Sequence, residues 1–357
     1  MKIRSFKTSL KLMITAGAML FSTTSMSANF PNLKQDIWTA PEFTFHDGQK
    51  LKNVNFAYTT LGNPKGEPVL ILHGTNGSSE SMLKDNFAKE LFAQGQPLDA
   101  QKYFIIIPDA LGTGKSTKPS DGLKAKFPKY NYADMVQGQY RLLTEGLGIK
   151  HLRLVLGNSM GGMQTWLWGV TYPEYMDALM PLASLPMPMS GRNFMTRRMI
   201  IDLIKADPEY NNGNYTKQPK LAQMANVYYG LATNGGTLRL QKLGPDGASA
   251  SAYVDAELAK PFNADANNTL YQWASSEDYD PSAKLGNIKA RLYAINSEDD
   301  ERNPQIFGVL EKAMEVIPNA KFYIIPQSDE TLGHSTTMHA KYWKDKLVEL
   351  LNEAPRK

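Results

Sequence analysis

The sequence contains no cysteine. This absence excludes a thiol nucleophile, thiolate metal ligands and disulfide bonds. The chain is still long enough to bury a hydrophobic core without covalent cross-links. Its histidine, aspartate and glutamate residues do not have the spacing of a metal site, so we expect neither a metal nor another cofactor.

Long hydrophobic runs are also scarce. Residues 12–21 form a largely apolar run of ten, which is too short to span a bilayer as a helix. Basic residues precede this run and small residues at 25–28 follow it, a pattern typical of a secretory signal. We therefore expect residues 1–28 to be a signal peptide and the protein to be periplasmic or secreted, without stable membrane association after cleavage. An uncleaved membrane anchor is the alternative.

Without residues 1–28, the sequence has no excess of positive or negative charge. All charges of this segment are basic, and they come from Lys2, Arg4, Lys7 and Lys11. Removing these four from the 39 Lys and Arg residues leaves 35, equal to the 35 Asp and Glu residues. A balanced charge gives no reason to expect nucleic acid or an anionic membrane as a partner.

The sequence does contain short apolar runs that alternate with helical patterns. Six runs are predicted to be buried strands, at 68–73, 103–108, 152–156, 179–183, 290–295 and 322–325. Such strands, separated by helices, predict an α/β fold with a mostly parallel sheet flanked by helices. Helical spacing also predicts a helix at 134–147 and a closing helix at 338–351.

This alternation stops between residues 185 and 289. The stretch has helical patterns at 195–206 and 221–232, turns rich in Asn and Gly, and no clear strand. We expect 29–184 and 290–357 to form the α/β core, and 185–289 to be an inserted helical cap. A cap over the carboxyl ends of the strands would cover the place where open α/β sheets bind ligands. A helical subdomain without contact to the site is the alternative.

The most informative motif is G-N-S-M-G at 157–161, directly after a predicted strand. A serine on so tight a turn between strand and helix adopts strained dihedrals, and small residues two positions to either side leave it room. The motif therefore predicts a nucleophile, Ser159, in an elbow formed by Gly157 and Gly161. An ordinary Gly/Ser turn is the alternative.

A serine nucleophile needs a base, and the base needs an orienting acid. His334 follows Gly333 in the loop after the last predicted strand, and we predict it to be the base. We expect His339 on the closing helix, in a packing or surface role. Three histidines remain. His46 lies in the N-terminal arm, His73 at the end of the first predicted strand, and His151 just before the strand that precedes Ser159.

The acid is expected in the acidic loop at 298–301, after the strand at 290–295. We rank Asp300 above Asp299 because it stands four residues before Pro304, a spacing common in this fold, but the sequence leaves both open. The chain order Ser159, Asp300, His334 is the order of α/β hydrolases.

The oxyanion of the reaction needs backbone donors beside the serine. We expect these to be the amides of Met160, at the start of the helix after Ser159, and Thr75, in the glycine-rich loop after His73.

A second glycine-rich motif, G-T-G-K-S at 112–116, is similar to a phosphate-binding loop. A Walker A motif requires a glycine five residues before Gly114, and this position is Asp109. We therefore expect no bound nucleotide.

Methionine is abundant in the cap and at the sheet edge. The residues are Met160, Met163, Met187, Met189, Met195 and Met199. Methionine usually fills gaps in a core, and a pliable wall for an acyl or other apolar group is the second interpretation.

Several motifs together carry a family resemblance. They are S-M-G-G-M-Q at 159–164, A-D-P-E-Y at 206–210 and G-N-Y at 213–215. With these motifs, most of the mature chain resembles the homoserine O-acetyltransferase branch of the α/β-hydrolase superfamily. The resemblance implies that Ser159 is the acylated nucleophile, Asp300 the acid and His334 the base.

The chain departs from this family where the acceptor would be held. The family's cap carries G-L-x-x-A-R, whose arginine contacts the acceptor, whereas this chain has K-L-A-Q-M-A at 220–225 and so ends on Ala225. The family's base is followed by Asp and then Phe-Leu, whereas S-T-T at 335–337 follows His334. Export is a third difference, because acetyl-CoA is not expected outside the cytoplasm.

We therefore predict a serine hydrolase that cleaves a small ester, or an amide, through an acyl-enzyme on Ser159. Its partner would be a small-molecule ester or acyl substrate, and the sequence leaves the oligomeric state open. An acyltransferase using the same triad is the alternative. A non-catalytic binding protein on the same scaffold is the third hypothesis.

Overall fold

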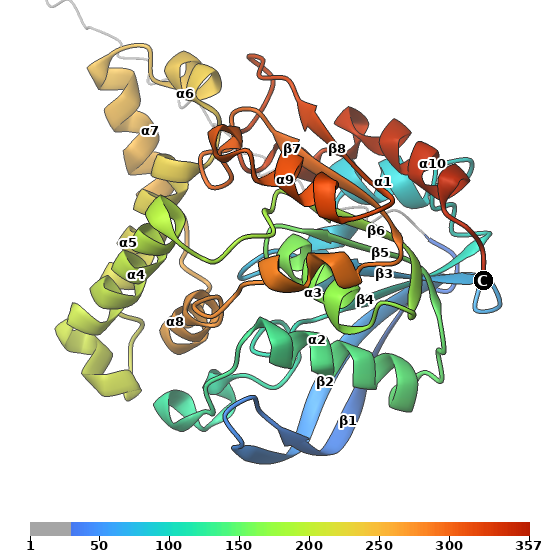
Figure 1. Cartoon of the computed structure of the whole chain (residues 1–357). Helices are drawn as coiled ribbons and strands as arrows, with labels where there is room; N and C mark the ends of the chain where they lie inside the picture. Colours follow the sequence, from blue (N-terminus) through green and yellow to red (C-terminus); the bar gives the residue numbers. More distant parts are fainter. Residues whose placement is uncertain (1–29) are drawn as a thin grey trace, which may run out of the picture.

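Eight strands form one sheet in the computed structural model, which describes residues 30–357 (Figure 1). The predicted signal peptide at 1–28 lies outside the described residues. The strands are β1 (Lys34–Thr44), β2 (Lys50–Gly62), β3 (Glu67–Leu72), β4 (Tyr103–Pro108), β5 (Leu152–Asn158), β6 (Met176–Leu182), β7 (Arg291–Ser297) and β8 (Ala320–Ile325). Their order across the sheet is β1-β2-β4-β3-β5-β6-β7-β8.

The six strands from β4 to β8 in this order are parallel, which confirms the predicted mostly parallel sheet. Each corresponds to one of the six apolar runs. Every residue of β5 and β6 is buried, because helices cover both faces of the sheet.

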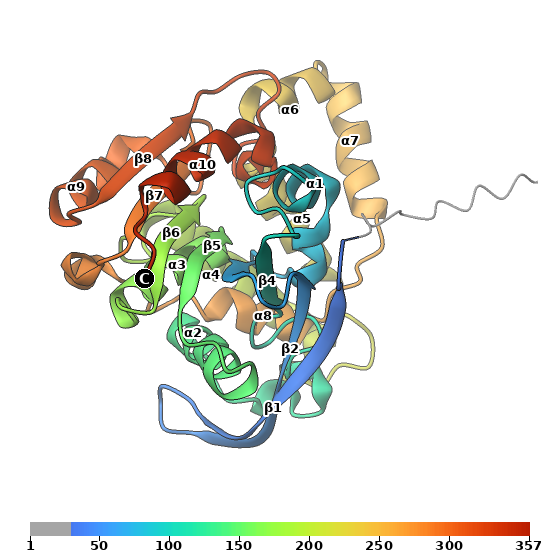
Figure 2. The same ribbon diagram turned by 90° about the vertical axis from the view of Figure 1, so that its right-hand side faces the viewer.

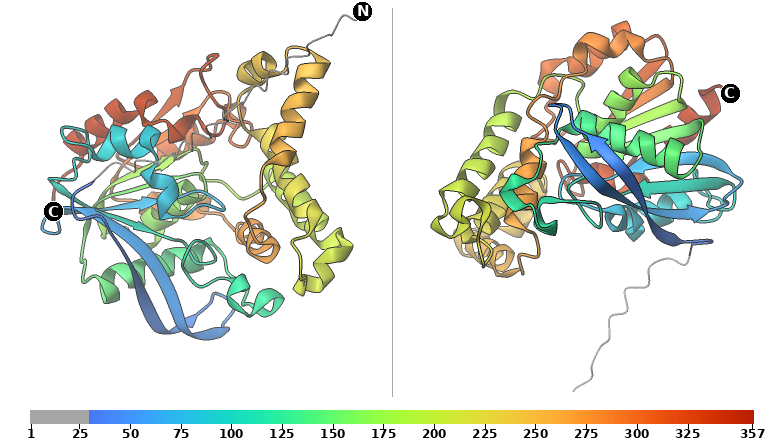
Figure 3. Two further views of the ribbon diagram at one scale, coloured as in Figure 1. Left: turned by 180° about the vertical axis from the view of Figure 1, so that it is seen from behind. Right: turned by 90° about the horizontal axis from the view of Figure 1, so that it is seen from below.

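The first two strands were not predicted. They pair antiparallel, and β2 also pairs antiparallel with β4, so that β1 becomes an edge of the sheet. Together they form a long hairpin, drawn in blue, that projects from the molecule (Figure 3). Most residues of β1 are exposed, so its sequence lacks the continuous apolar run that marks a buried strand.

Two layers of helices pack on the sheet (Figure 2). On one face, α1 (Asp85–Phe92) and α10 (Lys344–Glu353) bury Phe87 and Leu347. On the other face, α2 (Tyr132–Arg141), α3 (Met160–Thr171) and α9 (Val309–Val316) bury Val136, Trp166 and Leu310. Within the described residues, no helix is long and apolar enough to cross a membrane.

The closing helix begins six residues later than predicted. Residues 336–342 form two short 3-10 turns, and α10 begins only at Lys344. The indole N–H of buried Trp343 donates to the Thr337 carbonyl at 2.7 Å, which ties the turns to the core. His339 therefore lies between the two turns, and the expectation that it belongs to the closing helix is wrong.

Between β6 and β7 the described chain contributes helices and no strand of the sheet. These helices are α4 (Gly191–Ala206), α5 (Lys220–Thr233), α6 (Thr237–Leu243), α7 (Gly247–Ala259) and α8 (Ala266–Ala274). We call residues 185–289 the cap segment. It has a small core of its own, in which Ile200 and Ile204 of α4 pack with Ala222 of α5 and Trp273 of α8.

The cap segment contacts loops that follow the sheet strands. The Asn193 side chain donates to the Arg302 carbonyl after β7 at 3.2 Å, and Gln272 donates to the Leu111 carbonyl after β4 at 3.2 Å. Asn234 accepts a hydrogen bond from the Ser335 amide after β8 at 3.0 Å. These contacts place the cap segment beside the carboxyl ends of the parallel strands.

The close packing of α3 against β3 predicts how two glycine substitutions change the stability of the protein. A Cβ atom at Gly161 would lie 2.3 Å from the Leu72 carbonyl oxygen, whereas a Cβ atom at Gly230 of α5 would meet nothing within 4 Å. Gly161→Ala should therefore lower the free energy of unfolding by about 1–3 kcal/mol, because backbone has to move. Gly230→Ala should raise it by up to about 1 kcal/mol, because alanine favours a helix. Thermal and chemical unfolding of both variants measures the difference, and an unaffected Gly161→Ala protein would contradict this packing.

Candidate active site

Ser159 lies on a strained turn between β5 and α3. Its backbone φ of 57° and ψ of −113° fall in a region that non-glycine residues rarely adopt. A Cβ atom at Gly157 would lie 2.1 Å from the Gly161 carbonyl oxygen, so the two glycines allow the chain to close on itself around Ser159. The turn has the geometry that the G-N-S-M-G motif predicts.

The structure brings Ser159, His334 and Asp300 together in one chain of hydrogen bonds. Ser159 Oγ lies 2.7 Å from His334 Nε2, and His334 Nδ1 lies 2.8 Å from Asp300 Oδ2. The three residues come from the loops after β5, β8 and β7. All three are buried, with relative exposures of 5%, 7% and 2% in the order serine, histidine, aspartate.

The geometry separates the two candidate acids. Besides His334, the Asp300 carboxylate accepts from the Arg302 amide at 2.8 Å and from the Asn303 side chain at 2.9 Å. Asp299 instead accepts from the Thr331 hydroxyl at 2.7 Å and from the Gly333 amide at 3.0 Å. Asp300 is thus the partner of His334, while Asp299 holds the loop that carries this histidine.

Electrostatics favour a neutral imidazole facing an ionised carboxylate. Burial lowers the pKa of His334 below its ordinary value, and the positive charges of Arg302 and Arg197 lower it further. The negative charge of the Asp300 carboxylate acts in the opposite direction and raises this pKa. Burial alone would raise the pKa of Asp300, but His334 and the hydrogen bonds at its oxygens hold this pKa below its ordinary value. A neutral imidazole whose Nδ1–H points to a carboxylate can accept a proton at Nε2.

The loop that carries Thr75 lies against the serine. A Cβ atom at Gly74 would be 3.5 Å from the Ser159 Cβ atom. Within residues 30–357, the Thr75 amide donates to no recorded acceptor and its buried hydroxyl has no hydrogen-bond partner. Met160 is the first residue of α3, where helix amides are free to bind an anion.

His73 holds this loop in place. Its Nε2 accepts from the Ala110 amide at 3.0 Å, so its Nδ1 carries the proton and donates to the Gly74 carbonyl at 2.8 Å. Burial lowers the pKa of His73, which keeps it in this neutral form.

The other histidines lie away from the triad. His46 pairs with Asp134 at 2.7 Å, and His151 pairs with Asp177 at 2.7 Å at the opposite end of β5 and β6. His339 packs against Tyr342.

A cavity of about 580 Å³ lies between α3, the start of α4 and the loop after β7; Ser159, His334 and Asp300 do not line it, but neighbours of Asp300 do. Its lining includes Leu185, Tyr279 and Asn303, whose side chain contacts Asp300. Half of the methionines singled out in the sequence, Met163, Met187 and Met189, also line it. Met160 is instead fully buried in a core cluster, and Met195 and Met199 are exposed.

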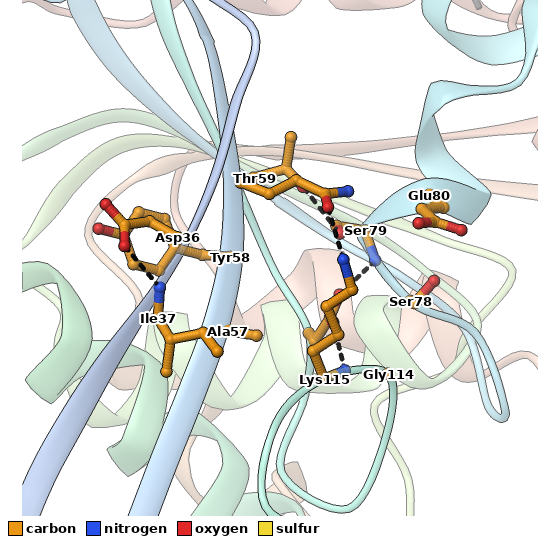
Figure 4. Close-up of a pocket in the computed structure, with 12 residues that line it drawn as sticks. Asp36, Ile37, Ala57, Tyr58, Thr59, Ser78, Ser79, Glu80, Gly114 and Lys115 are labelled. Carbon is orange, nitrogen blue, oxygen red and sulfur yellow. Dashed lines mark hydrogen bonds between the residues drawn. The ribbon is translucent and has the colours of Figure 1, made fainter.

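A second cavity, of about 290 Å³, lies between β2 and the loop after β4 (Figure 4). Four of its polar side chains are paired with each other: Lys115 Nζ donates to Gln35 at 2.7 Å, and Thr59 donates to Ser79 at 2.9 Å. Asp109 accepts from the Ser79 and Lys115 amides, so its carboxylate holds the G-T-G-K-S loop. None of the three triad residues lines this cavity.

Ala225 of α5 is the cap residue at which the resembled family has an arginine. Ala225 is buried in α5 with 1% relative exposure and brings no charge. Two other arginines, Arg197 of α4 and Arg302 after β7, act electrostatically on His334. No pattern in the sequence points to either arginine, because only the fold brings them beside the loop of His334.

These charges predict opposite effects of two substitutions on His334. Asp300→Asn should lower the pKa of His334 further, because it removes the carboxylate that stabilises the imidazolium. Arg302→Gln should raise this pKa, because it removes a repelling positive charge. Imidazole ¹⁵N shifts measured against pH, with His334→Gln to assign the signal, test both signs. A wild-type pKa above 6.5, the ordinary histidine value, would contradict the described burial.

The chain is similar in sequence to known α/β hydrolases and acetyltransferases. A family model described as "alpha/beta hydrolase fold" matches residues 67–332. A homoserine O-acetyltransferase of Haemophilus influenzae is 30% identical over 281 residues, which cover 70% of this chain and 77% of the relative. An ethyl acetate hydrolase of Pseudomonas veronii is 30% identical over 295 residues, which cover 76% of this chain and 81% of the relative.

Solved structures with the same fold also include a homoserine O-acetyltransferase. The crystal structure of a homoserine O-acetyltransferase from Bacillus anthracis superposes with a TM-score of 0.78 at 21% identity, and covers 91% of this chain and 99% of that one. The chain therefore belongs to the α/β-hydrolase fold family and is an enzyme that resembles its homoserine O-acetyltransferases and esterases.

Proposed function

We propose that this protein is a serine hydrolase that cleaves a small ester, or an amide, through an acyl-enzyme on Ser159. The observation that carries the proposal is the continuous hydrogen-bond chain from Ser159 through His334 to Asp300, starting at a strained turn. The ethyl acetate hydrolase among the relatives supports an ester as the substrate class.

In the first half-reaction, His334 Nε2 takes the proton of Ser159 Oγ while this oxygen bonds to the ester carbonyl carbon. The carbonyl oxygen becomes an oxyanion, which the amides of Met160 and Thr75 stabilise; one such donor typically lowers the barrier by about 2.7–4 kcal/mol. The tetrahedral intermediate collapses, and His334 gives its proton to the departing alcohol. The acyl group stays on Ser159.

In the second half-reaction, His334 takes a proton from water, and the resulting hydroxide equivalent attacks the acyl carbon. The bond to Ser159 Oγ breaks, His334 returns the proton to this oxygen, and the free acid leaves. Asp300 stays ionised throughout and stabilises the imidazolium that forms in both steps.

Acyl transfer is the second candidate, because a homoserine O-acetyltransferase is 30% identical to this chain. It differs only in the second half-reaction, where an alcohol would replace water. The departures at Ala225 and at 335–337 argue for water, since the resembled family's acceptor contacts are absent there. Periplasmic or secreted location, which we also propose from residues 1–28, would remove acetyl-CoA as the acyl donor.

Ser159→Ala tests the nucleophile. The variant should lose at least about 10⁴-fold in kcat/KM for a short-chain activated ester, because no other group can form the acyl-enzyme. Ser335→Ala, which removes a hydroxyl from the residue next to His334, is the matched control and should keep its activity. A fluorophosphonate probe should label the wild type and not Ser159→Ala. A folded Ser159→Ala enzyme with full turnover would refute the assignment.

Product analysis separates hydrolysis from transfer. The mature protein should convert a short-chain activated ester to free acid, and L-homoserine should change neither the rate nor the product. Mass spectrometry of the products, with Ser159→Ala as the blank, gives the answer. Acyl-homoserine formed at the expense of free acid would establish the transferase reaction instead.

A further inference from the structure

Four side chains from different parts of the fold form one cluster above the loop of the triad acid. They are Arg197 of α4, Tyr229 of α5, Trp273 of α8 and Arg302 after β7. The Arg302 guanidinium lies 4.3 Å from the centre of the Tyr229 ring, and the Arg197 guanidinium lies 5.0 Å from the Trp273 ring. The two aromatic rings touch, with centroids 4.7 Å apart. We call these four residues the arginine–aromatic cluster.

Neither arginine side chain forms a salt bridge within residues 30–357, although the charge of Asp300 acts on Arg302 from a greater distance. Arg197 is 2% exposed, and its guanidinium contacts only neutral acceptors, at 2.8 Å from Asn193, 3.2 Å from Ser276 and 3.4 Å from Tyr132. The Arg302 guanidinium donates to the Thr233 hydroxyl at 3.0 Å. Arg197 is buried and Arg302 is partly buried, and their positive charges repel each other. Such repulsion is unfavourable unless an anion joins the two groups.

The aromatic members of the cluster are also unsatisfied. The Tyr229 hydroxyl and the Trp273 indole nitrogen are buried, and neither has a hydrogen-bond partner among the described residues. Tyr229 is 3% exposed and Trp273 is 5% exposed, so bulk water does not serve them. A buried donor without an acceptor destabilises the folded state, because it has lost its hydrogen bond to water. Because all four side chains can donate hydrogen bonds, what the cluster lacks is an acceptor.

The cluster lies next to the reacting groups. The Arg302 backbone amide donates to Asp300 Oδ1 at 2.8 Å, so the backbone from which this side chain starts is tied to Asp300. Of the four cluster residues, Arg302 is the one that lines the 580 Å³ cavity, together with Asn303, whose side chain contacts Asp300. Both arginine charges reach His334 electrostatically. An anion held by the cluster would therefore lie close to an ester on Ser159.

We propose that the arginine–aromatic cluster binds a carboxylate group of the substrate, so that the enzyme prefers an ester that also carries a carboxylate. This inference rests on the proposed ester chemistry at Ser159. Guanidinium groups pair with the two oxygens of a carboxylate through parallel hydrogen bonds, which gives both affinity and orientation. The carboxylate belongs either to the acyl part or to the alcohol part of the ester, and two substrates distinguish these sources.

A binding experiment tests the site without catalysis. In the Ser159→Ala background, isothermal titration calorimetry compares monoethyl succinate with ethyl levulinate, which has a neutral methyl ketone in place of the carboxylate. Monoethyl succinate should bind the more tightly, and adding Arg302→Gln should weaken its binding by at least about 30-fold. The same comparison uses O-acetylglycolate and acetoxyacetone, which place the carboxylate and the ketone on the alcohol part.

Kinetics provide the second readout. At pH 8, where His334 is neutral, the wild type should show a higher kcat/KM for the carboxylate member of at least one pair. The ratio of kcat/KM between the two members should fall by at least about 30-fold in Arg302→Gln, mainly through KM, and recover in part in Arg302→Lys. Arg198→Gln is the matched control, since Arg198 is an exposed neighbour on α4 that pairs with Asp202, and it should leave the ratio unchanged.

The outcomes are distinguishable. If both carboxylates bind no better than their ketones, and the ratio is the same in wild type and Arg302→Gln, the cluster is not a carboxylate site. Ser159-dependent hydrolysis of the neutral esters would still support the proposed function in that case. If the carboxylates bind through Arg302 but no ester is turned over, the anion site stands and the proposed function fails. Unchanged thermal unfolding of Arg302→Gln excludes misfolding as the cause of a loss.

Discussion

The close approach of the first turn of α3 to the strands beside it is the constraint on which the site depends. Cβ atoms at Gly157, Gly161 and Gly162 would each lie 2.1–2.3 Å from a backbone oxygen, and only glycine allows such contacts. These contacts fix the turn in a conformation in which Ser159 has a positive φ and its hydroxyl lies within hydrogen-bond distance of His334. Packing of the surrounding sheet and helices offsets this backbone strain. The sheet is well covered at this point, since every residue of β5 and β6 is buried.

The sequence was sufficient for those features that local pattern controls. The six parallel strands carry continuous apolar runs because they are covered on both faces, and the serine turn has a motif with a steric cause. The hairpin of β1 and β2 was missed because its strands are antiparallel, half exposed and rich in polar residues, so they lack such a run. The start of α10 was misplaced because the packing of Trp343 ends the preceding turns, and this packing is a tertiary contact.

The site shows the same division. Chain order and loop position predict Ser159 as the nucleophile and His334 as the base. Asp299 and Asp300, however, are adjacent carboxylates in one loop, and only the direction of each side chain separates them. The arginine–aromatic cluster has no sequence pattern at all. Its members are up to about a hundred residues apart and come from three cap helices and one core loop. Their lack of acceptors appears only when hydrogen bonds are counted in three dimensions.

Buried charge connects this cluster with the chemistry at Ser159. Burial is the main cause that lowers the pKa of His334, and the positive charges of Arg302 and Arg197 lower it further, which makes the imidazole a weaker base. A carboxylate bound between the two arginines would cancel much of this repulsion and return the pKa of His334 toward its ordinary value. A base whose pKa lies closer to the working pH removes the Ser159 proton more effectively. A substrate carboxylate would thus orient the ester and strengthen the base in the same binding event, whereas a neutral ester of equal size would do neither.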